Sequence, residues 1–380
     1  MSEYKLIAPC LFGLEAVLKR EIQDLGYNII EVEDGRVAFG GDGLAICRSN
    51  IWLRTAERVM LEVGRFKATN FEELFDQIES IEWERYIPVD GKFWVSKASS
   101  IKSQVYSGRD IQSIAKKAMV SRMSLSYGFD QFKEDGASYP VRIFIKKNVV
   151  SVCLDTSFEA LHRRGYRIHT SKAPISETLS AALVLLSVWN KDRSFVDPMC
   201  GSGTLVIEAA MIGANLAPGL NRSFTAEGWK NLIPKSMWME AVDEANAKYD
   251  PKADLNIQGF DKDYMVLKTA RENAENAGVD HFIHFQERDV ADLTHSKPYG
   301  VIVTNPPYGE RLSNTEEVEA LYKTMGVAFA KLEHWSMYIL TSFEQFEKAY
   351  GTTANKKRKL YNGMLKTTLY QYLGKRPPRK

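Results

Sequence analysis

The chain has 380 residues, 44% of them hydrophobic and 26% charged, the balance of an ordinary globular protein long enough for two or three domains. It contains no run of about 18 apolar residues and its N-terminus lacks the layout of a signal peptide, so we expect no membrane span and a cytoplasmic protein. Four widely spaced cysteines, without a paired Cys or a Cys/His cluster, predict buried free thiols and no zinc or iron–sulfur centre.

The net charge of +2 conceals two basic segments. Residues 101–170 hold 12 basic against 6 acidic residues, and residues 345–380 hold 10 against 1. Basic segments on a nearly neutral chain fit the binding of a polyanion at defined surfaces, and they fit solvated faces equally well. Charge alone leaves both interpretations open.

Residues 1–66 alternate short strand and helix patterns. The spacing predicts a strand over 4–8, a helix over 14–25 that ends at Gly26, and a hairpin across Asp34-Gly35. A second helix and a further strand complete a small α+β unit of ferredoxin-like pattern.

Residues 67–160 form a second compact unit. A helix is predicted over 71–81, with Asn70 as its N-cap, and a hairpin is predicted across Lys147-Asn148. Between them, the segment 107–123 reads as an amphipathic basic helix. The basic residues of this helix are Arg109, Lys116, Lys117 and Arg122.

A glycine loop follows a short strand near the middle of the chain. The strand over 194–197 leads into Asp197-Pro198-Met199-Cys200-Gly201-Ser202-Gly203-Thr204 and then a helix. Gly201 and Gly203 permit close approach of the backbone to a ligand at a helix N-terminus, but the loop completes neither the dinucleotide fingerprint nor a P-loop. Asp197 would repel a pyrophosphate and could pair with a cationic amino acid group. This favours S-adenosylmethionine, which carries an ammonium and a sulfonium and no phosphate.

The connection between Met211 and Asp254 is longer than an ordinary link from helix to strand, and the sequence does not decide whether it covers the site or packs elsewhere. Two strand patterns with acidic ends follow it. Asp261 ends the strand over 257–261 and should hydrogen-bond ribose hydroxyls, as the acidic residue after the second strand does in doubly wound folds. Asp289 ends the strand predicted over 282–290.

The apolar run 300–303 closes on Thr304-Asn305-Pro306-Pro307-Tyr308-Gly309, which predicts a buried parallel strand with a ligand pocket outside its carboxyl end. The amide oxygen of Asn305 and the carbonyl of Pro306 could accept the two hydrogens of a conjugated amine, on a nucleobase or on Gln. A neutral acceptor suits this better than a carboxylate, which is costly to bury unpaired. Proline fixes the backbone, and Tyr308 offers a face for stacking. Farther on, a final hairpin is predicted around Asn362-Gly363.

These motifs resemble those of a known family. The glycine loop matches motif I of class I methyltransferases, D-P-x-C-G-S-G-T in the RNA branch, and the order of elements over 1–160 resembles a THUMP domain with its ferredoxin-like partner. The whole chain resembles the THUMP-containing class I RNA methyltransferases related to the bacterial 23S rRNA guanine-N2 methyltransferases. The resemblance implies an α/β chain with a ferredoxin-like subdomain at 1–66, a THUMP RNA-binding domain at 67–160 and a Rossmann-like, seven-stranded methyltransferase domain at 161–380.

The resemblance also implies the residues of the site. Thr178, at the start of a helix predicted over 177–189, matches a position that lines the cofactor pocket, although a helix N-terminus explains it equally well. Asp289 matches the acceptor of the adenine amine. The implied catalytic residues are Asn305, Pro306, Pro307 and Tyr308. The implied contacts of S-adenosylmethionine are Thr178, Asp197, Pro198, Cys200, Gly201, Ser202, Gly203, Thr204, Asp261, Asp289 and Asn305.

The implied reaction is methyl transfer to the exocyclic N2 of a guanine, with 23S rRNA as the preferred substrate. It requires no metal, and the base has to be unpaired or flipped to enter the pocket. Structured RNA would bind the basic surface of residues 101–170 and the basic C-terminus. The alternatives are a tRNA guanine-N2 enzyme, an adenine-N6 DNA or glutamine-N5 protein methyltransferase, and a non-catalytic RNA-binding assembly factor. A DNA enzyme would more readily carry a separate base-reading domain, and a protein enzyme would not need the basic N-terminal half.

Overall fold

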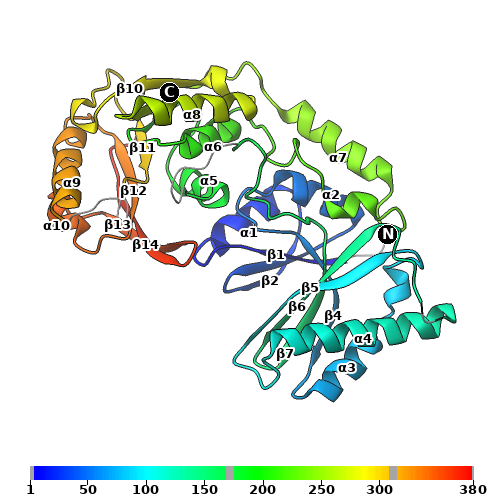
Figure 1. Ribbon diagram of the computed structural model, residues 1–380. Helices are drawn as coiled ribbons and strands as arrows, with labels where there is room; N and C mark the ends of the chain where they lie inside the picture. Colours follow the sequence, from blue (N-terminus) through cyan, green and yellow to red (C-terminus); the bar gives the residue numbers. More distant parts are fainter. Residues whose placement is uncertain (1–3, 130, 168–174, 308–314, 379–380) are drawn as a thin grey trace.

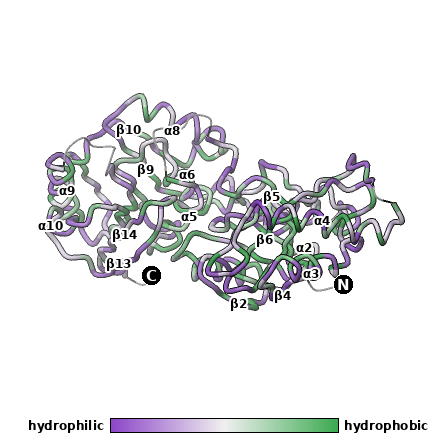
Figure 2. Tube along the Cα trace, turned by 60° about the horizontal axis from the view of Figure 1, so that its bottom comes forward, coloured by the Kyte–Doolittle hydropathy of each residue, from purple (hydrophilic) through white to green (hydrophobic). Residues whose placement is uncertain are grey.

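The computed structural model describes residues 4–129, 131–167, 175–307 and 315–378. Within these ranges the chain forms two seven-stranded sheets, one in each half of the sequence (Figure 1). Figure 2 shows the two halves side by side, with hydrophilic stretches along the outer helices of the C-terminal half. No helix in these ranges is both long and apolar enough to cross a bilayer.

The N-terminal sheet has the strand order β2-β3-β1-β4-β7-β6-β5. Its strands and the helices that cover them are β1 (Tyr4–Pro9), α1 (Glu15–Asp24), β2 (Ile29–Glu33), β3 (Arg36–Gly41), α2 (Gly43–Trp52), β4 (Met60–Lys67), α3 (Phe71–Glu79), β5 (Lys92–Ile101), α4 (Gly108–Tyr127), β6 (Ser138–Lys146) and β7 (Val149–Asp155).

The strand β4 joins the two N-terminal units into one sheet. It pairs with β1 through Leu61 and Met60, and it pairs with β7 along most of its length. The hydrophobic pattern of β4 weakens after Val63, because residues 64–67 are half-buried or exposed and none is fully buried. Pairing with β7 therefore extends β4 beyond what its own hydrophobic pattern indicates.

Local signals in this half behave as predicted. The Asn70 side chain accepts from the Glu73 amide at 2.8 Å, and the Glu73 carboxylate accepts from the Thr69 amide at 2.7 Å, which starts α3. The hairpin of β6 and β7 turns through Lys147 and Asn148, whose φ angles are 52° and 64°. A two-residue hairpin turn of type I′ requires a positive φ at both of these positions.

The C-terminal sheet has the order β10-β9-β8-β11-β12-β14-β13, and only β14 and β13 run antiparallel to their neighbours. This confirms the predicted seven-stranded methyltransferase-like architecture. Its elements are α5 (Glu177–Leu186), β8 (Phe195–Asp197), α6 (Thr204–Gly213), α7 (Lys235–Lys248), β9 (Ile257–Asp261), α8 (Tyr264–Asn276), β10 (Ile283–Glu287), β11 (Val301–Thr304), α9 (Thr315–Phe329), β12 (Ser336–Thr341), α10 (Phe346–Tyr350), β13 (Lys356–Asn362) and β14 (Leu365–Tyr372).

The long connection between α6 and β9 packs against the N-terminal half. The Trp229 ring is fully buried and stacks on Tyr139 of β6, with ring centroids 5.1 Å apart. The Arg222 guanidinium donates to the backbone carbonyls of Glu159, Ala160 and Arg163. In addition, α7 lies along α2 (Figure 1). The connection therefore forms part of the contact between the two halves of the chain.

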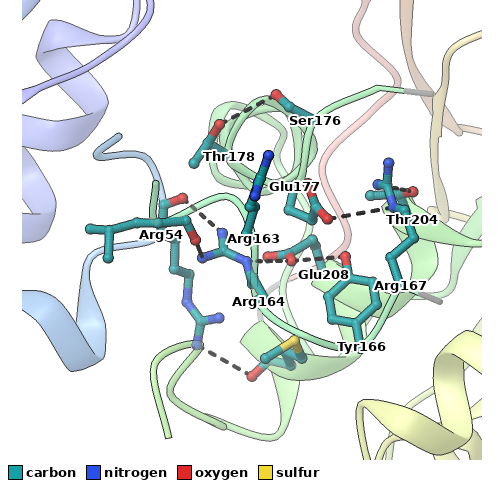
Figure 3. Close-up of polar contacts among 12 residues, drawn as sticks. Arg54, Arg163, Arg164, Tyr166, Arg167, Ser176, Glu177, Thr178, Thr204 and Glu208 are labelled. Carbon is teal, nitrogen blue, oxygen red and sulfur yellow. Dashed lines mark hydrogen bonds and ion pairs between the residues drawn. The ribbon is translucent and has the colours of Figure 1, made fainter. Parts of the chain in front are cut away.

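A buried ion pair lies where the halves meet (Figure 3). The Arg164 Nε donates to the Glu208 carboxylate at 2.7 Å, and Arg164 also donates to the backbone carbonyl of Arg54 at 2.8 Å. The Tyr166 hydroxyl donates to the same oxygen of Glu208. Burial opposes the charge of Arg164, but Glu208, Tyr166 and Glu177 together outweigh it, so the pKa of Arg164 lies above its ordinary value. Arg164, which belongs to the basic segment 101–170, is therefore buried and does not contribute to a basic surface.

Several cations of the basic segment 101–170 are neutralised by neighbouring carboxylates. Lys116 pairs with Glu134 at 2.7 Å, and Arg122 pairs with Glu84. Arg142 pairs with Asp155 at 2.9 Å. The exposed basic side chains of this segment that form no ion pair with a described carboxylate are Lys102, Arg109, Lys117, Lys133 and Lys147.

Candidate active site

Parallel strands bring the predicted residues to one edge of the C-terminal sheet. Asp197 of β8 pairs with Gly259 of β9, two residues before Asp261. On its other side β8 pairs with β11, where Val196 is level with Ile302. The carboxyl ends of β9, β8 and β11 therefore meet, and they present Asp261, Asp197 and Asn305 at the edge where ligands bind in open α/β sheets.

The glycine loop is held tightly on one side and open on the other. Gly201 and Gly203 have φ angles of 52° and 85°, which residues with a side chain rarely adopt. A Cβ at Gly203 would lie 3.1 Å from the Cβ of Ala270, whereas a Cβ at Gly201 would meet no atom within 4 Å. The Gly201 amide donates to the Asp261 carboxylate at 3.0 Å. The loop thus offers a free backbone surface, beside two carboxylates, which fits a cationic ligand.

The Asp197 carboxylate ties this loop to the strand that precedes Asn305. Its Oδ1 accepts from the Thr304 hydroxyl at 2.7 Å and from the Met199 amide at 3.2 Å. Burial raises the pKa of Asp197 to about 7, and the negative charge of Asp261 adds to the rise. The sequence reasoning missed Thr304 as a partner of Asp197. No local signal indicates this contact, because it joins the ends of two strands that lie far apart in the sequence.

Asp261 and Asp289 differ in their surroundings. Asp261 accepts from the amides of Gly201 and Asp263, and burial raises its pKa above the ordinary value. Its carboxylate retains further acceptor positions. Asp289 is exposed and accepts from the Ala291 amide at 2.9 Å, so it caps a short 3₁₀ turn. The prediction that it ends a strand was wrong, because β10 ends at Glu287 and the chain turns there.

Asn305 carries a buried side-chain acceptor at this edge that the described residues leave unused. Its side chain is half-buried, and its Oδ1 is buried without a hydrogen-bond partner among the described residues. An unsatisfied buried acceptor costs about 1–3 kcal/mol, so such an atom points to a donor supplied by a ligand. Pro306 is buried and Pro307 is half-buried. Tyr308 lies outside the described residues.

The other predicted cofactor residues are held by structural contacts. The Thr204 hydroxyl accepts from Arg167 at 2.9 Å, and the Ser202 carbonyl accepts from the Asn273 amide group at 3.0 Å. Thr178 is fully buried and donates to Glu57 of the N-terminal half at 2.8 Å. Its hydroxyl therefore makes a contact between the two halves, and its role toward a cofactor stays a prediction.

Pro198 and Cys200 complete the predicted cofactor set. Both are buried in the glycine loop, and all four cysteines of the chain are free and buried, as predicted. Burial raises the pKa of the Cys200 thiol well above its ordinary value, so this group is neutral. It lies close to Gly259, where an added Cβ would sit 3.1 Å from the sulfur. Cys200 thus packs the loop against β9 and is not a nucleophile.

The fold and this edge define a methyltransferase domain of the class I type, preceded by ferredoxin-like and THUMP domains. Three family models match the chain: an RlmL ferredoxin-like domain over residues 5–60, a THUMP domain over 68–155, and an RMKL-like methyltransferase domain over 164–371. The chain therefore belongs to the RMKL-like methyltransferase family.

Relatives and solved structures agree with this assignment. The chain is 49% identical over its whole length to "Putative RNA methyltransferase YpsC" of Bacillus subtilis, covering 99% of that protein. It is 33% identical to "Ribosomal RNA large subunit methyltransferase K/L" of Buchnera aphidicola, with 89% of this chain spanning about half (49%) of that longer protein. The crystal structure of SMU.472, a "putative methyltransferase complexed with SAH", is 41% identical, covers both chains completely and superposes with a TM-score of 0.94.

Proposed function

We propose that the chain is an S-adenosylmethionine-dependent RNA methyltransferase that modifies the exocyclic N2 of a guanine in ribosomal RNA. The observation that carries the proposal is the buried Oδ1 of Asn305, which has no hydrogen-bond partner among the described residues and lies at the sheet edge that also holds the open side of Gly201. The THUMP domain and the names of the relatives support RNA as the substrate.

The residues around the glycine loop fit the methyl donor. Asp197 would hold its ammonium, Asp261 its ribose hydroxyls and Asp289 its adenine amine. The backbone at Gly201 would allow the donor to lie close to the loop. When bound, the donor supplies a methyl group on sulfur, and transfer to an amine nitrogen breaks the carbon–sulfur bond and leaves a thioether.

Asn305 and Pro306 would orient the acceptor. The Asn305 Oδ1 and the Pro306 carbonyl each accept one hydrogen of the guanine amine, which turns the nitrogen lone pair out of conjugation and toward the methyl group. The nitrogen loses a proton after it becomes cationic, so no strong base is required. Tyr308 would stack on the base, which has to be unpaired or flipped to enter.

RNA would bind through the N-terminal half and the basic C-terminus. The exposed basic side chains of residues 101–170 that pair with no described carboxylate lie on α4, in the loop between α4 and β6, and in the turns after β5 and β6. The proposal places the domain boundaries after residues 66 and 160. With β4 crossing the first of these, the ferredoxin-like and THUMP domains would share one sheet as a single RNA-binding body.

A labelled methyl donor tests the substrate class. Methyl incorporation into RNA, and not into DNA or protein, is the expected result. In addition, mass spectrometry should find N2-methylguanosine reduced in the ribosomal RNA of cells that lack the gene. Methyladenine in DNA or methylglutamine in protein would replace the proposal with the corresponding alternative. RNA binding without any methyl transfer would support the assembly-factor alternative.

The raised pKa of Asp197 predicts a pH dependence of cofactor binding. In the free protein the group holds its proton below a pKa of about 7, but an ammonium partner favours the carboxylate, so binding below pH 7 releases a proton. Affinity for S-adenosylhomocysteine, which keeps the ammonium, should weaken about tenfold from pH 6 to pH 5.

Isothermal titration calorimetry between pH 5 and pH 8 measures this dependence. Asp197→Asn is the control and should bind weakly with a flat profile below pH 7. Stability in the absence of ligand depends on pH with the opposite sign. A folded-state pKa above 3.8 gives a contribution that is present below about pH 4 and is lost as the pH rises through 7. Equal affinities of the native protein at pH 5.5 and pH 7 would contradict the pairing of Asp197 with the ammonium.

A further inference from the structure

The last hairpin extends beyond the edge of the sheet that holds the candidate site. Thr341, the last residue of β12, is level with Thr368 of β14, which is level with Lys359 of β13. Residues 360–367 therefore project past β12. Because β11 and β12 are parallel and Thr304 is level with Ile339, the hairpin projects from the same edge as Asn305.

The projecting tip combines basic and apolar side chains. Tyr361 is paired across the hairpin with Lys366, and Lys359 lies two residues before Tyr361, so the three side chains share one face. The Lys359 ammonium lies 5.4 Å from the centre of the Tyr361 ring. Met364, at the turn, is 99% exposed. Neither lysine forms an ion pair with a described carboxylate.

A loop from the first domain meets this tip. Phe12, which precedes α1, is 54% exposed, and its ring packs edge-on against Tyr361 with the centroids 6.2 Å apart. The contact is fixed by the Arg358 guanidinium, which donates to the Gly13 carbonyl at 3.2 Å. Figure 1 shows the tip of the hairpin beside the start of α1. The two ends of the chain thus build one surface.

We propose that this surface, made of Phe12, Lys359, Tyr361, Met364 and Lys366, binds the single-stranded RNA that flanks the target base. Lysines attract the backbone phosphates, and the half-buried ring of Tyr361 and the exposed Phe12 and Met364 offer surfaces on which unstacked bases can pack. Three strand spacings, roughly 14 Å, separate β13 from β11, so a base held at Asn305 leaves its neighbours within reach of the tip. The inference rests on the proposed function, since it assumes an RNA base at Asn305.

Lys359→Gln with Lys366→Gln tests the surface in the full chain. The probe is a fluorescein-labelled single-stranded RNA of mixed sequence, and the readout is its dissociation constant from fluorescence anisotropy at several salt concentrations. We expect about tenfold weaker binding and a salt slope reduced by about 1.4, because each phosphate contact to a single strand contributes about 0.7. Tyr361→Ala should weaken binding by about fivefold or more through lost stacking.

The matched control removes two lysines outside the segments assigned to RNA. Lys323 of α9 and Lys331, which follows α9, are both exposed. Lys323→Gln with Lys331→Gln should leave the dissociation constant within about twofold. Equal losses in the two double variants, or a loss for duplex RNA alone, overturn the inference. Because the readout is binding, a native protein that binds this RNA through the tip yet methylates none would overturn the proposed function alone.

Discussion

Asn305→Ala should abolish most methyl transfer and leave the fold intact. Removing one preorganised hydrogen-bonding group from a reacting centre commonly costs about 100-fold to 1,000-fold in kcat, and Asn305 would be the group that turns the amine lone pair. A purely structural asparagine would behave differently. The Oδ1 of Asn305 has no partner among the described residues, so its removal takes away an unsatisfied acceptor, and the free energy of unfolding should stay the same or rise slightly.

Steady-state methylation of RNA and urea denaturation, performed on the same preparations, measure both effects. Asn273→Ala is the matched control, because Asn273 is a buried asparagine whose amide group donates to the Ser202 carbonyl. This variant should lose about 1–3 kcal/mol of stability and keep most of its turnover. An Asn305→Ala protein that unfolds more easily while its kcat stays within about threefold would assign Asn305 a structural role.

Local patterns in the sequence predicted the elements well. The N-cap at Asn70, the turn across Lys147-Asn148 and the loop at Gly201 each depend on a few consecutive residues whose chemistry permits one backbone conformation. The order of the motifs then predicted which strands carry Asp197 and Asn305. Since parallel strands end on one edge, the composition of the candidate site followed from the fold.

Contacts between distant segments were not predictable in this way. The bond from Thr304 to Asp197, and that from Thr178 to Glu57, join residues whose own neighbours in the sequence give no hint of the partner. The charge count of the segment 101–170 has the same limit. A count of basic residues cannot reveal that Arg122 faces Glu84, because partner choice is decided by packing and not by composition.

Arg164→Met should destabilise the chain by about 3–5 kcal/mol. The Glu208 side chain is fully buried, and without Arg164 it would remain as an uncompensated carboxylate where the two halves of the chain meet. Urea denaturation followed by tryptophan fluorescence measures the loss. Arg163→Met is the control, since the neighbouring Arg163 is 67% exposed and pairs weakly with Glu159, and its replacement should cost less than about 0.5 kcal/mol.

A second substitution separates the buried charge from other effects of Arg164→Met. Adding Glu208→Gln removes the orphan charge but keeps an acceptor for the Tyr166 hydroxyl, which donates to Glu208 in the native protein. The double variant should regain more than half of the lost stability, because an unpaired buried charge costs more than the missing hydrogen bonds to the Arg54 and Leu161 carbonyls. A double variant as unstable as Arg164→Met would mean that those carbonyls, and not the Glu208 charge, hold the junction together.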